Sequence, residues 1–108
     1  MKDFGISLLM DFYGNLLPEK QLDMLEQYYQ EDLSLSEIAE NSGITRQGVH
    51  DSIKRASAEL KSYEEKLGLL KKFSDITDSA ERIKKLVSDD AESRDEILSL
   101  LDIIIKEA

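Results

Sequence analysis

Apolar side chains recur along the chain every three or four residues, which is the period of an amphipathic α-helix. No stretch alternates apolar and polar residues as a half-buried strand does, and the sequence contains no Asn-Gly or Asp-Gly hairpin turn. One Pro and five Gly in 108 residues leave few breaks between the helical stretches. The pattern therefore predicts an all-α fold.

The positions of caps and breakers divide this pattern into separate helices. The predicted helices run from about Phe4 to Asn15, from Pro18 onward, from a cap at Ser34 or Ser36 to Asn41, from a cap at Thr45 for more than 20 residues, from about Asp78 to Val87, and from about Ala91 to Glu107. Gly68 is expected to weaken the fourth helix without ending it, because the apolar spacing continues through Leu70 and Phe73. Ala80, Ile83, Leu86 and Val87 are expected to point inward.

Residues 35–54 have the features of a helix-turn-helix. The motif needs a small residue in its first helix, a Gly four residues later in the turn, a buried apolar residue after that Gly, and two apolar residues on the inner face of the second helix. Those positions hold Ala39, Gly43, Ile44, Val49 and Ile53. The requirements are geometric, because two steeply crossed helices pack through a small contact. We therefore predict a helix-turn-helix core over residues 18–67.

The start of the predicted second helix of the motif carries the candidate DNA contacts. The polar and basic residues there are Thr45, Arg46, Gln47, His50, Lys54 and Arg55. Arg46 suits a guanine edge and Gln47 an adenine edge, if this helix enters the major groove. Thr45 and Arg55 could reach phosphates. The alternative is a solvated helix face, and Asp51 is expected to be solvated or ion-paired because it would repel phosphates.

The charge of the chain changes this picture. The net charge is −9, whereas proteins held to nucleic acid by bulk charge are normally basic. The acid is unevenly distributed, since residues 1–33 hold two basic and seven acidic residues and residues 75–108 hold five and ten. Residues 45–55 hold three basic residues against Asp51 alone. The distribution permits DNA binding, but predicts that one subunit binds weakly and with strong salt dependence.

Several classes of protein are disfavoured by composition. The chain has no Cys and one His, and it lacks a nucleophile–His pair, a Gly-rich phosphate loop and a cluster of metal ligands. We therefore expect no enzyme, no cofactor and no metal. No apolar run approaches the 18 residues of a membrane span, and the N-terminus lacks the features of a signal peptide. These observations predict a cytoplasmic protein without membrane insertion.

Several segments resemble a known family. They are DFY at 11–13, SLSEIAE at 34–40, RQGV at 46–49 and YEEKL at 63–67, and the likeness extends over residues 6–70. The sequence resembles the YlxM-type proteins, which are small bacterial proteins with a helix-turn-helix like region 4 of sigma factors. One difference is Gly48, where Ala is common. The resemblance implies a sigma factor region 4-like fold with a long recognition helix, a homodimer, a regulatory role, and a link to the signal recognition particle.

Two functional hypotheses follow. The first is a dimeric regulator that binds double-stranded DNA through residues 45–55. The alternative is an interaction module that binds a GTPase or the RNA of the signal recognition particle, with little or no DNA binding. In either case we expect a single domain over residues 1–108, in which the helices of residues 75–108 complete the core or form the dimer. Residues 97–105 are apolar nearly all round, which favours a subunit interface.

Overall fold

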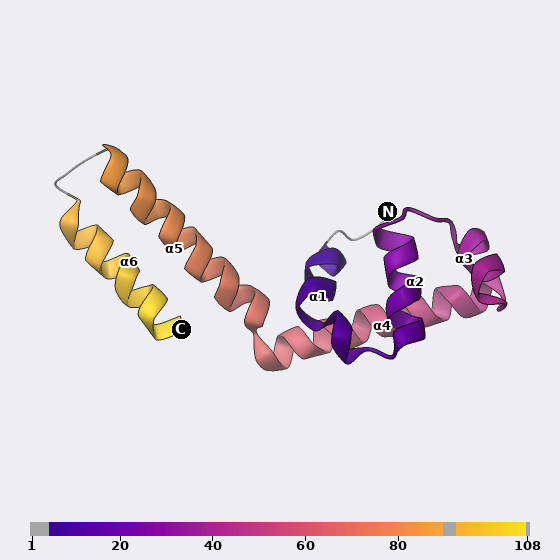
Figure 1. The fold of residues 1–108 in the computed structure, drawn as a ribbon. Helices are drawn as coiled ribbons and strands as arrows, with labels where there is room; N and C mark the ends of the chain where they lie inside the picture. The colour runs from indigo at the N-terminus through magenta and orange to yellow at the C-terminus, as the bar shows by residue number, and fades with distance from the viewer. Residues whose placement is uncertain (1–4, 90–92, 108) are drawn as a thin grey trace. The chain divides into compact units, whose positions relative to one another are not determined.

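The computed structural model describes residues 5–89 and 93–107, and the regular structure of this part of the chain is entirely helical. The elements are α1 (Gly5–Tyr13), the 3-10 helix η1 (Gly14–Leu16), α2 (Glu19–Tyr29), α3 (Leu35–Ser42), α4 (Arg46–Leu67), α5 (Leu69–Asp89) and α6 (Arg94–Glu107) (Figure 1). The predicted all-α fold is confirmed. The predicted starts at Phe4 and Ala91 lie outside the described residues. The chain forms two compact units, Met1–Gly68 (unit 1) and Leu69–Ala108 (unit 2).

Unit 1 is organised around the inner face of α4. The side chains at Val49, Ile53, Ala56 and Leu60 recur at helical spacing and are all buried. Helices α1, α2 and α3 each pack against α4 (Figure 1). Their most deeply buried apolar residues are Ile6 and Tyr13 of α1, Leu25 of α2 and Ile38 of α3. The hydrophobic faces of the three shorter helices therefore pack against one apolar stripe on α4.

Two polar contacts fix the shorter helices within this unit. The buried Tyr13 hydroxyl donates a 2.6 Å hydrogen bond to Glu64 Oε1, which joins the end of α1 to the last part of α4. The buried Gln27 side chain donates to Asp23 Oδ2 at 3.0 Å and accepts from Asn41 Nδ2 at 2.9 Å. The hydrogen bond from Asn41 to Gln27 joins α3 to α2. These bonds satisfy the polar groups of Tyr13 and Gln27, which would otherwise destabilise the fold by being buried without partners.

A capping box starts α3. Ser34 Oγ accepts from the Glu37 N–H at 3.1 Å, while Glu37 Oε1 accepts from the Ser34 N–H at 3.0 Å. Ser34 is therefore the cap, and Ser36 is not. The hydrogen bond from the Ser34 backbone, followed by the one involving its side chain, holds the pKa of the Glu37 carboxyl below its usual value. The ionised form of Glu37 is thus the one that the folded chain favours.

Two glycines in left-handed conformation end α3 and α4. Gly43 has φ +70° and donates its N–H to the Ala39 carbonyl at 2.9 Å. Gly68 has φ +62° and donates to the Glu64 carbonyl at 2.8 Å. The prediction that α4 exceeds 20 residues is confirmed, since it has 22. The prediction that Gly68 only weakens the helix is wrong, because its left-handed backbone ends α4.

The apolar spacing after Gly68 belongs to a new helix. Helix α5 begins at Leu69, so the predicted start near Asp78 is wrong. Leu70 and Phe73, which we assigned to the continuation of the fourth helix, lie in the first turns of α5. The spacing alone could not distinguish these cases, because a left-handed Gly interrupts the backbone while leaving the helical period on both sides intact.

Unit 2 consists of α5 and α6, which lie side by side (Figure 1). Leu86 is the buried apolar residue described for this unit, and no described residue of α6 is buried. Ala80 and Val87 were expected to point inward but are exposed, since two paired helices bury only the seam between them. Arg82 Nε lies 3.1 Å from Glu96 Oε1 and links the two helices. Within the described residues, no helix is both long and apolar enough to cross a membrane.

We predict that Gly43→Ala lowers the free energy of unfolding by about 1–2 kcal/mol, the cost of placing an L-residue in the left-handed region. A Cβ at this position would meet no atom within 4 Å, so the loss is conformational and not steric. Gly43→Asn should lose less, because Asn adopts this conformation more readily. Urea unfolding measures the free energy of unfolding of wild type, Gly43→Ala and Gly43→Asn. Equal stability of wild type and Gly43→Ala would contradict the prediction.

We predict that Glu37→Gln changes the pH dependence of stability. Gln retains the capping-box geometry but not the charge. Because folding lowers the pKa of Glu37 from 4.5, its ionisation stabilises the fold above that value, and the stabilisation is lost as pH falls through the folded pKa. Wild type should therefore have the higher melting temperature at neutral pH, and the difference should disappear at acidic pH. Glu40→Gln, an exposed position in the same helix, controls for net charge. A difference in melting temperature between wild type and Glu37→Gln that does not change with pH would refute a role for the ionised Glu37 carboxylate.

Candidate nucleic-acid interface

Helix α3, the turn at residues 43–45 and the first part of α4 form the helix-turn-helix. The turn reverses the chain through left-handed Gly43, and Thr45 then starts α4 by accepting a 3.0 Å hydrogen bond from the Gly48 N–H. Val49 and Ile53 anchor the inner face of α4, as their spacing predicted. This arrangement leaves the opposite face of the first turns of α4 open to solvent.

Ile44 differs from its expected position. It was predicted to be buried in the turn, but 43% of it is exposed. Ile38 and Val49 are fully buried, so they fill the core on either side of the turn without Ile44. Ile44 lies instead beside Gly48, where a Cβ would be 3.5 Å from Ile44 Cδ1 and 3.1 Å from Thr45 Oγ1. Gly48 thus gives the Thr45 cap more room than the Ala that is common at this position.

The candidate DNA contacts lie together at the beginning of α4. All six are exposed, namely Thr45, Arg46, Gln47, His50, Lys54 and Arg55. Thr45 Oγ1 is already the acceptor of the cap, so the hydroxyl hydrogen is what remains for a phosphate. The other five project from the exposed side of α4, where side chains could reach bases or phosphates.

Asp51 interacts with two of these candidates. Gln47 Nε2 donates to Asp51 Oδ1 at 3.0 Å, and His50 Nδ1 lies 3.5 Å from the same oxygen. Asp51 is therefore both solvated and partnered. An adenine contact by Gln47 would require its hydrogen bond to Asp51 to break, so Asp51 restrains the candidate base-reading side chains in the free protein.

A groove beside α4 was not anticipated from the sequence. It is formed by the end of α2, the first residue of α3 and the middle of α4, and has a volume of about 410 Å³. Three of its residues are basic or imidazole side chains of α4, namely His50, Lys54 and Lys61. Their positions i, i+4 and i+11 place them on one stripe of a helix, and this spacing was the signal that could have found Lys61.

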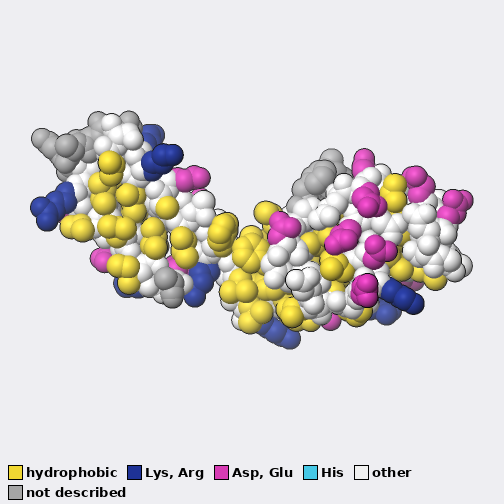
Figure 2. Space-filling view, viewed as in Figure 1, with side chains coloured by type: hydrophobic (Ala, Val, Ile, Leu, Met, Phe, Trp, Pro, Cys, Tyr) yellow, Lys and Arg dark blue, Asp and Glu magenta, His cyan; other side chains and the backbone are white. Residues whose placement is uncertain are grey.

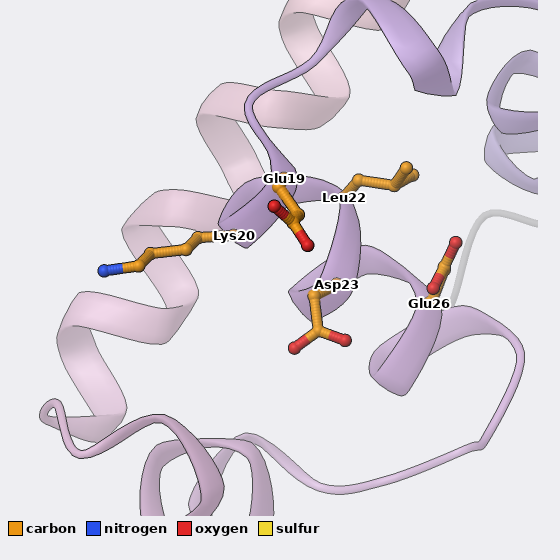
Figure 3. A pocket seen from close by; sticks show the side chains of 5 residues that line it. All are labelled: Glu19, Lys20, Leu22, Asp23 and Glu26. Atoms are coloured by element: carbon orange, nitrogen blue, oxygen red, sulfur yellow. The ribbon is translucent and has the colours of Figure 1, made fainter.

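The outer surface of α2 has the opposite charge. A pocket of about 530 Å³ is lined by Glu19, Lys20, Leu22, Asp23 and Glu26, with three carboxylates and one ammonium (Figure 3). Figure 2 shows further acidic side chains on the same face of unit 1. This face would repel phosphates, so a nucleic acid would have to approach α4 from another side.

The described residues contain no group of three or more His, Asp or Glu side chains placed to hold a metal ion.

Comparison with known proteins identifies the family. Residues 1–100 match the family UPF0122, described as "Putative helix-turn-helix protein, YlxM / p13 like". A UPF0122 protein of Desulforamulus reducens is 53% identical over 88 residues, which are 81% of this chain and 75% of that protein. One from Thermoanaerobacter is 44% identical over 104 residues, or 94% and 89%. One from Bacillus cereus is 42% identical over 105 residues, or 97% and 96%. The chain therefore belongs to the UPF0122 family of YlxM / p13 like helix-turn-helix proteins.

Proposed function

We propose that this protein is a non-catalytic regulator that binds double-stranded DNA through the first turns of α4. The observation that carries the proposal is the group of exposed polar and basic side chains that immediately follows the turn of the helix-turn-helix. Helices in this position enter the major groove with their N-terminal residues toward the bases. The local charge supports it, since residues 45–55 hold three basic side chains and one acidic one.

Each candidate has a role that follows from its chemistry. Arg46 can donate two parallel hydrogen bonds to a guanine edge, and Gln47 can pair with an adenine edge after leaving Asp51. Thr45 precedes these residues, Arg55 lies more than two turns beyond them along α4, and both would contact phosphates. His50 and Lys54 lie one and two turns further along α4, so they would contact the adjoining bases or backbone.

The proposal includes a homodimer, because three basic residues from one subunit make few phosphate contacts. Unit 2 is the proposed dimer element. It exposes large apolar side chains that a two-helix unit cannot cover, as the apolar patch over α5 and α6 in Figure 2 shows. They include Phe73, Leu98 and Ile105, which are 57%, 49% and 70% exposed. A two-fold dimer would read half-sites about one helical turn of DNA apart.

The dimer is tested by light scattering. We expect a mass of about twice the 12.3 kDa of one chain. Ile105→Asp should dissociate the dimer, because it places a charge on the proposed interface at a side chain that contributes little to the fold of one subunit. Arg94→Asp, an exposed position of the same helix that lies outside residues 97–105, is the control. A monomeric wild type would refute this part of the proposal.

Base reading is tested on duplexes selected by the wild-type protein from a random pool. Arg46→Ala should weaken binding to the selected duplex by about 1–3 kcal/mol and relax the preference at one base position. Arg55→Ala should instead weaken binding to all duplexes about equally. Lys20→Ala, which removes the same charge from the acidic pocket of α2, should change neither. Unchanged binding by Arg46→Ala would contradict the assignment.

The acidic pocket of α2 favours a second candidate function. Its carboxylates, at Glu19, Asp23 and Glu26, would attract a basic partner and accelerate encounter with it. The family resemblance suggests a GTPase or the RNA of the signal recognition particle as the partner, and of these two the GTPase is the one that the acidic pocket would attract, because RNA is an anion. Recovery of DNA but of no particle component in a pull-down would count against this candidate. Either function would be exercised in the bacterial cytoplasm.

A further inference from the structure

The groove between α2 and α4 is suited to an anion. Every residue that lines it is neutral or basic, in contrast to the pocket on the outer face of α2. Lys54 and Lys61 are exposed at its rim, while the buried Ile53 and the half-buried Leu35 contribute apolar wall. A cleft lined by charge of one sign and by walls of low dielectric concentrates the electric field. The groove would thus attract phosphates although the chain as a whole is acidic.

The shape of the groove suits an extended ligand. Lys54 and Lys61 are seven residues apart, which is about 10 Å along the axis of a helix. One strand of DNA carries a phosphate about every 3.4 Å of its axis, so a strand passing along the groove offers phosphates to both lysines. The rings of Tyr28 and Tyr29 lie edge to face with centroids 5.0 Å apart and form part of another wall. Tyrosine hydroxyls are common phosphate contacts.

We propose that this groove receives the phosphate backbone of one DNA strand, with Lys61 as a backbone contact outside the base-reading residues. The proposal rests on the proposed function and extends it. DNA is favoured over an acidic protein segment by continuity, because His50 and Lys54 belong both to the groove and to the candidate base-reading face. No acidic residue lines the groove, although the Asp51 carboxylate lies beside it, with Oδ1 3.5 Å from Nδ1 of His50.

The test is Lys61→Gln, measured with several duplex sequences across a series of salt concentrations. We expect the slope of log affinity against log salt concentration to fall in magnitude by about 1, with about a tenfold loss of affinity near 0.1 M salt. The loss should be the same for every sequence. Lys66→Gln is the matched control, because Lys66 is exposed on the same helix, about 140° around its axis from Lys61, and does not line the groove.

Four outcomes would overturn the inference. If wild type binds duplexes and Lys61→Gln binds identically, the groove does not hold the backbone, while the proposed function stands. If Lys61→Gln loses affinity for one sequence only, Lys61 reads a base. If Lys66→Gln loses as much affinity for the duplexes as Lys61→Gln, the loss reflects the net charge of the protein and not a contact in the groove. If wild type binds no duplex at any salt concentration, the proposed function fails, and the inference fails with it.

Discussion

The packing of three short helices on one face of α4 is the constraint on which unit 1 depends. Val49, Ile53, Ala56 and Leu60 form a buried stripe along this 22-residue helix. Because the same helix begins at the turn of the helix-turn-helix, the core also determines which of its residues face outward. The hydrophobic packing of α4 therefore determines which candidate residues between Arg46 and Arg55 are exposed, and no other contact is needed to orient them.

Acidic and basic side chains of unit 1 lie on different faces, and α4 carries the basic ones that line the groove. The outer face of α2 collects carboxylates, whereas the exposed side of α4 and the groove beside it carry Lys54 and Lys61. Such separation lets a chain of net charge −9 present an anion-attracting surface in one place and an acidic surface in another. It also makes the two candidate functions compatible, since DNA and a basic protein would approach different faces of unit 1.

Local sequence patterns predicted most of unit 1. The turn at Gly43, the cap at Thr45 and the inner face of α4 follow from the chemistry of single turns, and the structure confirms them. For the cap of α3 the sequence left Ser34 and Ser36 open, and the structure identifies Ser34. The exposed position of Ile44 and the termination at Gly68 could not be read this way, because tertiary packing and a left-handed backbone decided them. The groove could not be predicted from local patterns, because residues of different helices line it. The seven-residue spacing of Lys54 and Lys61 indicated only that both lie on one side of α4.

Selection from a random duplex pool tests most directly whether the exposed side of α4 binds duplex DNA. The purified chain should enrich a consensus made of two half-sites, with an affinity that falls steeply as salt concentration rises. A protein that enriches no sequence and binds no duplex even at low salt would contradict the claim. In that case the helix-turn-helix would serve as a scaffold for the acidic surface of α2.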